Sequence, residues 1–156
     1  MKNDAPTGTA RDAAYRLLAR RSHSSVELHR KLSRKGFCPD EIAQVLAECS
    51  AKGYLNDEET ALRWAQNLVR TKLWGRLKIS AYLAHKGIPR HVIEQVQQCI
   101  WQEFSEEAVA QQALQKRCVG AQKKLSPSQK AAFLAARGFS SSVIYTLVDR
   151  LCDDEQ

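Results

Sequence analysis

The stretch Leu83-Ala-His-Lys86-Gly87-Ile88 has two close counterparts in the chain, Leu32-Ser-Arg-Lys35-Gly36-Phe37 and Leu134-Ala-Ala-Arg137-Gly138-Phe139. The glycines, at positions 36, 87 and 138, are 51 residues apart each time. Apolar positions further along keep the same offset, as Ile42, Ile93 and Ile144 show. Self-similarity at a fixed period of this length is typical of an array of one supersecondary unit. The 156-residue chain is therefore predicted to contain three tandem units.

The shared stretch has the form of a helix end. Glycine is favoured just past the last helical residue, because the left-handed conformation needed there strains a residue that has a Cβ atom. The apolar residue after the glycine can then contact the leucine four positions before the glycine. The cation that precedes each glycine lies at the negative end of the helix dipole. We therefore expect these three cations to be structural and not dedicated binding contacts: Lys35, Lys86 and Arg137.

Residues typical of helix starts divide each unit into three helices. Ser24 with Glu27, and Ser126 with Gln129, have the spacing of a capping box at the start of a second helix. The stretch Leu73-Trp74-Gly75 separates the first two helices of the middle unit. Because β-branched runs are few, helix is favoured over strand. The predicted fold class is all-α, a tandem repeat of three-helix units with about nine helices in an elongated or curved array.

A small unit buries its apolar faces poorly, so neighbouring units are expected to lean on one another. The predicted organisation is a flexible N-terminus at 1–9, repeat 1 at 10–55, repeat 2 at 56–104, repeat 3 at 105–152 and a C-terminal tail at 153–156.

Charge alternates along the chain in step with the repeat. The net charge is +7 and the isoelectric point is near 9.3, which favours an acidic partner. Three segments, 16–35, 63–90 and 116–137, hold twenty Lys and Arg residues and one acid, Glu27. The other acids collect between these segments, so stacking of the units is expected to place the basic segments on one side of the array.

The basic segments have two interpretations. Solvated helix faces carry Lys and Arg without any function, and this is the simpler explanation for a single residue. Segregation on this scale instead favours contact with an anionic polymer, where spaced cations neutralise phosphates. Trp74 could stack on a base, although packing is the commoner role for a tryptophan. The candidate contacts are Arg20, Arg21, Arg30, Lys31, Arg34, Arg70, Lys72, Trp74, Arg76, Lys78, Lys123 and Lys124.

Motifs for catalysis and for metal or cofactor binding are missing from the sequence. The four histidines have no metal-ligand spacing, and no phosphate-binding glycine loop or serine-nucleophile elbow occurs. No apolar run approaches the roughly 18 residues that span a bilayer, and the N-terminus lacks a secretory apolar region. The five cysteines are scattered and are expected to be reduced and to fill space in a cytoplasmic protein. We expect no enzyme, no cofactor and no membrane contact.

The repeat resembles a known family. Ala14-Tyr15-Arg16-Leu17-Leu18-Ala19-Arg20-Arg21, followed by the Lys35-Gly36-Phe37 stop, looks like the first unit of RecX regulatory proteins. Gly53-Tyr54-Leu55-Asn56-Asp57 and Lys72-Leu73-Trp74-Gly75 resemble the second unit of that family. The resemblance extends from about Arg11 to Leu151, and in the third unit it rests on Arg137-Gly138-Phe139 and the apolar spacing.

This resemblance implies a bacterial cytoplasmic protein that binds RecA, the recombinase that forms a filament on single-stranded DNA. It implies inhibition of the ATPase, strand-exchange and coprotease activities of RecA, and so modulation of DNA repair and the SOS response, without catalysis. The array would bridge filament subunits, block growth and favour disassembly, with direct DNA contact possible and a monomer expected. Two alternatives stay open: a free-standing nucleic-acid-binding helical repeat protein, and a scaffold for an acidic protein.

Overall fold

The computed structural model describes residues 8–119 and 125–153, with side chains as far as Asp149. Within these residues it contains nine α-helices, one π-helical turn and no strand, which confirms the all-α prediction. Most of the predicted flexible N-terminus and C-terminal tail, and the candidates Lys123 and Lys124, lie outside the described residues.

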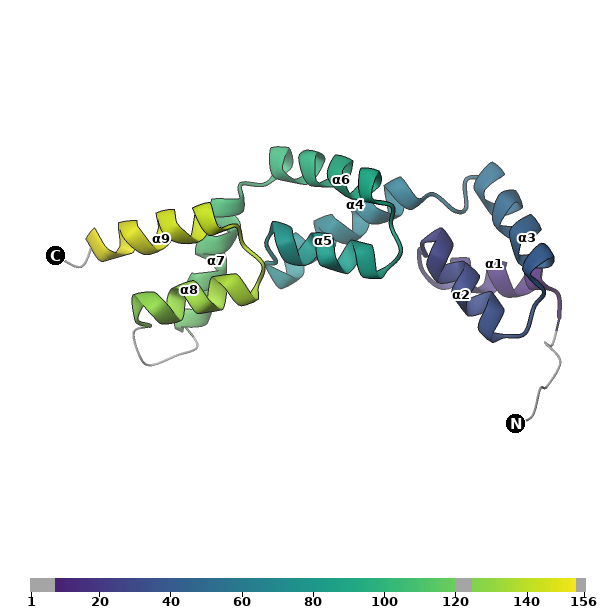
Figure 1. Ribbon diagram of the computed structural model, residues 1–156, viewed down its shortest axis with the longest axis horizontal. Helices are drawn as coiled ribbons and strands as arrows, with labels where there is room; N and C mark the ends of the chain where they lie inside the picture. Colours follow the sequence, from purple (N-terminus) through teal and green to yellow (C-terminus); the bar gives the residue numbers. More distant parts are fainter. Residues whose placement is uncertain (1–7, 120–124, 154–156) are drawn as a thin grey trace.

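The helices form three successive groups, here named units 1, 2 and 3. Figure 1 shows an elongated array in which the second helices α2, α5 and α8 lie toward one long edge and the third helices α3, α6 and α9 toward the other. The division into separately folding domains stays a prediction. Unit 1 is α1 (Ala10–Arg20), α2 (Ser25–Arg34) and α3 (Pro39–Ala51); unit 2 is α4 (Asp57–Asn67), η1 (Leu68–Lys72), α5 (Arg76–His85) and α6 (Arg90–Glu103); unit 3 is α7 (Glu106–Val119), α8 (Pro127–Ala136) and α9 (Ser141–Asp153).

All three second helices end as the sequence predicts. Gly36, Gly87 and Gly138 have φ values of +89°, +79° and +78°. In each case the next N–H donates to the carbonyl of the leucine before the stop, as from Ile88 to Leu83 at 3.1 Å. The apolar residue that follows each glycine is buried. The repeated stretch is therefore a helix stop that also anchors the chain in the core.

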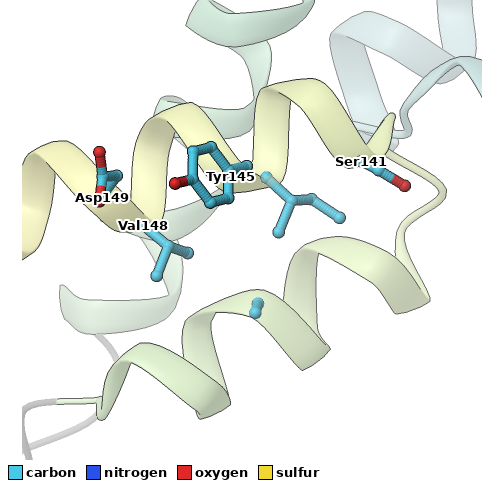
Figure 2. A pocket seen from close by; sticks show the side chains of 6 residues that line it. Ser141, Tyr145, Val148 and Asp149 are labelled. Atoms are coloured by element: carbon cyan, nitrogen blue, oxygen red, sulfur yellow. The ribbon is translucent and has the colours of Figure 1, made fainter.

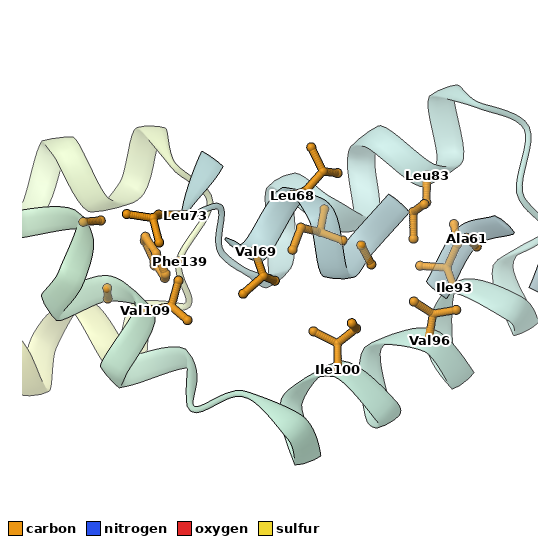
Figure 3. Close-up of a cluster of buried hydrophobic side chains, with 14 of the residues drawn as sticks. Ala61, Leu68, Val69, Leu73, Leu83, Ile93, Val96, Ile100, Val109 and Phe139 are labelled. Atoms are coloured by element: carbon orange, nitrogen blue, oxygen red, sulfur yellow. The ribbon is translucent and has the colours of Figure 1, made fainter. Parts of the chain in front are cut away.

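The hydrophobic core has two parts. One cluster lies within unit 1 and includes Leu28, Leu32 and Ile42. The other runs without interruption through units 2 and 3, from Ala61 to Leu147 (Figure 3). The prediction that units lean on their neighbours holds for the apolar packing of units 2 and 3 but not for unit 1, which has a core of its own.

The two junctions between units are formed by residues at equivalent repeat positions, 51 residues apart. Ser24, the N-cap of α2, donates its hydroxyl to the carbonyl of Lys86 at 2.5 Å. Gly75, the N-cap of α5, donates its N–H to the carbonyl of Arg137 at 2.9 Å. A Cβ atom on Gly75 would lie 2.5 Å from the backbone of Phe139, so only glycine fits this close approach. The starts of α2 and α5 thus dock on the helix stops of units 2 and 3.

An acidic side chain strengthens each junction. Asp57 accepts from the N–H of Ser25 at 2.7 Å, and Glu106 accepts from the N–H of Arg76 at 3.3 Å. Each acid is the first residue of its unit and completes the N-terminal hydrogen bonding of the second helix in the preceding unit. Glu106 is itself buried, so these hydrogen bonds satisfy a carboxylate that has left water.

Two local predictions need correction. Glu27 does not close a capping box on Ser24; its carboxylate turns instead to Arg21 and Lys86. The box of Ser126 with Gln129 is present. The cysteines are predicted to fill space, but of the four whose side chains are described only Cys49 is buried, whereas three are exposed free thiols: Cys38, Cys99 and Cys118.

Candidate functional site

Four of the predicted contact residues are exposed cations whose side chains have no partner among the described residues. Arg30 and Arg34 project from α2, Arg20 closes α1 and Lys72 closes η1. Their ammonium and guanidinium groups are therefore available to an external anion without the loss of an internal contact. They are the part of the predicted set that best fits a binding role.

Three other candidates are paired with acids. Arg21 contacts Glu27 at 2.6 Å and Arg70 contacts Glu103 at 2.8 Å. Arg76 contacts the buried carboxylate of Glu106 at 3.2 Å and lies over the ring of Trp101. These arginines hold elements together, so the structure separates them from the four free cations.

Lys31 and Glu27 belong to a small, partly buried network at the first junction. The ammonium of Lys31 lies 2.8 Å from Nε2 of His23, whose ring is almost fully buried. Burial lowers the pKa of His23, and it also lowers the pKa of Lys31. Burial acts to raise the pKa of Glu27, but the hydrogen bonds and charge of Arg21, with the charge of Lys86, outweigh it and hold this pKa at about 2. Glu27 is thus an ionised anchor between two cations.

Trp74 is a packing residue in this structure. Its ring meets Tyr82 edge-on, with 6.0 Å between ring centroids, and the ammonium of Lys78 lies 4.7 Å from its centroid. Lys78 also donates to the carbonyl of Ala136 at 3.0 Å. The lysine therefore covers a ring face that a stacked base would need. Of the two interpretations of Trp74, these contacts favour packing.

A cationic cleft of about 380 Å³ opens where η1 and α5 of unit 2 meet α7 and α8 of unit 3. Among the described residues, four cations and two aromatic rings line it, and no acid does. Sequence reasoning identified Lys72, Trp74 and Lys78 but not Lys116, and it had set Arg137 aside as structural. The lining residues are Thr71, Lys72, Trp74, Lys78, Lys116, Phe133, Ala136 and Arg137.

Two other hollows are lined by fewer charged side chains. The groove between α8 and α9, shown in Figure 2, encloses about 360 Å³ and is mostly apolar, with Tyr145 and Val148 along its wall. A hollow of about 440 Å³ on unit 1 is lined by Tyr15, Tyr54 and Lys52 among others. Across the described residues no group of three or more His, Cys, Asp or Glu side chains could hold a metal ion. None of the described helices is long and apolar enough to cross a bilayer.

Comparison with known proteins decides the family. The model of the RecX first three-helix domain matches residues 10–49, and the model of the second three-helix domain matches residues 56–96. The Regulatory protein RecX of Chlorobaculum tepidum is 34% identical over 157 aligned positions, which cover 94% of this chain and 91% of that protein. The chain belongs to the RecX family.

Other RecX proteins agree with this assignment over most of the chain. The Regulatory protein RecX of Vibrio parahaemolyticus is 33% identical and covers 89% of this chain and 89% of its own length. The crystal structure of RecX from Lactobacillus salivarius has the same fold, with a TM-score of 0.77 and 19% identity over 91% of this chain and 94% of that one. RecX membership therefore holds for all three units and not only for the two with a domain match.

Proposed function

We propose that this RecX-family protein binds the RecA filament on single-stranded DNA and inhibits the ATPase, strand-exchange and coprotease activities of RecA. The observation that carries the proposal is RecX family membership over nearly the full length of the chain. The proposal implies a non-enzymatic regulator of DNA repair and the SOS response in the bacterial cytoplasm.

The architecture supports this proposal. A filament presents the same surface at regular intervals, and the array presents second helices at regular intervals along one edge (Figure 1). Free cations lie on and beside these helices, including Arg30 and Arg34 on α2. An elongated array can contact more than one filament subunit, which is the requirement for bridging. Growth of the filament would be blocked where the array lies across its end or groove.

The test is DNA-dependent ATP hydrolysis by RecA in the presence of sub-stoichiometric amounts of the chain. We expect suppression by the wild-type protein and weaker suppression by Arg34→Glu. The matched control is Arg90→Glu, since Arg90 is also an exposed helix cation but lies on α6 toward the other edge. No suppression at any ratio would contradict the proposal.

The cationic cleft also favours a second candidate, a nucleic-acid-binding protein that acts without RecA. Such a protein would bind single-stranded DNA with an affinity that falls steeply with salt and would leave RecA hydrolysis unchanged. An acidic-protein scaffold would show neither effect. The two measurements together separate the three candidates.

A further inference from the structure

The two junctions between units place different charges at equivalent positions. At the first junction, Arg21 and Lys86 lie on either side of Glu27, at 2.6 Å and 3.4 Å from its Oε1 atom. The repeat offset of 51 residues carries these positions to Lys72, Lys78 and Arg137. A cation–anion–cation triad in the first junction thus becomes a triad of three cations in the second.

The three cations of the second triad, Lys72, Lys78 and Arg137, lie close together in the structure. All three side chains line the cleft, and Arg137 donates to the carbonyl of Lys72 at 2.5 Å. Lys116 adds a fourth positive charge from α7. Because like charges that share a cleft repel one another, the arrangement is costly until an anion enters. None of the lining residues that the structure describes supplies the negative charge that Glu27 supplies at the first junction.

Aromatic rings and backbone carbonyls hold two of these cations in place without neutralising them. Lys78 lies over Trp74, and the guanidinium of Arg137 lies 4.8 Å from the centroid of Phe133. Each group donates one hydrogen bond to a carbonyl, and an ammonium has three N–H donors and a guanidinium five. Donors therefore remain for a ligand, and the side chains of Lys72 and Lys116 have no described partner at all.

We propose that this cleft binds a phosphodiester group of single-stranded DNA, which takes the place that a carboxylate occupies at the first junction. A volume of about 380 Å³ exceeds the needs of a small anion and admits a nucleotide unit. The planar guanidinium of Arg137 suits two phosphate oxygens. The choice of a DNA strand over other phosphates rests on the proposed function above.

The experiment is direct binding of fluorescein-labelled oligo(dT) to the full chain, without RecA, over a range of salt concentrations. Lys72→Gln and Lys116→Gln remove cations that have no internal partner, so both variants should fold as the wild type does. We expect each to weaken binding roughly tenfold at 50 mM salt and to lower the log–log salt slope by about 0.7. Lys78→Glu restores the acid of the first junction and should abolish binding through the cleft.

The control is Arg90→Glu, which makes the same charge change as Lys78→Glu at a side chain that is 93% exposed and outside the cleft. This variant should retain most of the affinity for oligo(dT), since it alters only the overall electrostatic potential of the protein and not the cleft. Thermal melting of every variant shows whether a loss of binding comes from unfolding. Unchanged affinity in Lys72→Gln and Lys116→Gln, or no oligo(dT) binding by the wild type, would overturn the proposal.

Two further outcomes would assign the cleft to another occupant and so reject a DNA strand. Displacement of oligo(dT) by equimolar ATP would indicate a free-nucleotide site. Cleft variants that keep oligo(dT) affinity but lose RecA inhibition would indicate an acidic protein segment. Because RecA is absent from the binding assay, loss of the cleft site and failure of RecA inhibition are measured separately.

Discussion

At the scale of the residue, Gly87 carries two constraints at once. Its φ of +79° disfavours any residue with a Cβ, and that Cβ would overlap the side chain of Val26 in unit 1. Gly53 has a similar φ of +72° but nothing within 4 Å of the added atom. We expect Gly53→Ala to lower the free energy of unfolding by roughly 1 kcal/mol, and Gly87→Ala to lower it by clearly more. Urea denaturation of both variants measures the difference, and equal losses would contradict the close approach.

Glu27 gives a pH dependence with a definite sign. Its pKa falls from 4.5 to about 2 on folding, so its stabilising charge is fully present above pH 4.5 and is lost as the pH falls toward 2. Glu27→Gln should be less stable than the wild type at pH 7 and should lose less further stability across that window. Melting temperatures between pH 7 and pH 2 test this. Glu94→Gln, which removes a carboxylate that is 61% exposed, should follow the wild-type profile.

At the scale of the element, the start of α5 depends on a side chain from the next unit. Glu106 accepts hydrogen bonds from the N–H and Nε of Arg76 and from the N–H and hydroxyl of Ser140. Its side chain is only 8% exposed, so an amide in its place leaves these donors poorly satisfied. Glu106 therefore joins the first turn of α5 to the loop before α9.

We expect Glu106→Gln to lower the free energy of unfolding by about 2 kcal/mol, in the range for hydrogen bonds to a charged group. Glu103→Gln removes a salt bridge to Arg70 from a side chain that is 41% exposed, and it should cost less than about 1 kcal/mol. Thermal unfolding followed by circular dichroism compares the two variants. A similar loss of unfolding free energy in both variants would mean that the burial of Glu106 contributes nothing to stability.

At the scale of the whole molecule, the two cores predict two cooperative units. Unit 1 encloses its own cluster, whereas units 2 and 3 share one (Figure 3). The first junction is held by charged and polar contacts, including Glu27 with Lys86 and Ser25 with Asp57. Such contacts add little apolar burial, so opening of unit 1 need not open the rest.

Native-state hydrogen exchange tests this division. Amides of α1, α2 and α3 should exchange as one group with a lower opening free energy than those of α4, α5 and α6. Because salt screens charge pairs more than apolar packing, raising the ionic strength should lower protection in unit 1 first. A single opening free energy for all nine helices would contradict the division.

The sequence by itself determined the helices, their stops and the period of the array. These features depend on residues within one or two turns of each other, such as Ile88 and Leu83, so spacing along the chain predicts them. Family membership likewise follows from the repeated motifs and is confirmed by the relatives. The capping-box signal at Ser24 failed because Glu27 has partners elsewhere, in Arg21 and in the more distant Lys86.

Only the tertiary structure decided which cations are free. Arg21 and Arg34 look equivalent in the sequence, yet the first is paired with an acid and the second is exposed without a partner. Arg21 finds its acid six residues away, in Glu27. Other contacts join two units, across 59 residues for Glu27 with Lys86 and 65 for Arg137 with the Lys72 carbonyl. Composition cannot resolve such contacts, because a charge is neutralised by what lies near it in space. The repeat placed the basic segments, and the docking of unit 3 on unit 2 brought Lys72, Lys78 and Arg137 into one cleft, with Lys78 at the repeat position of the acid Glu27.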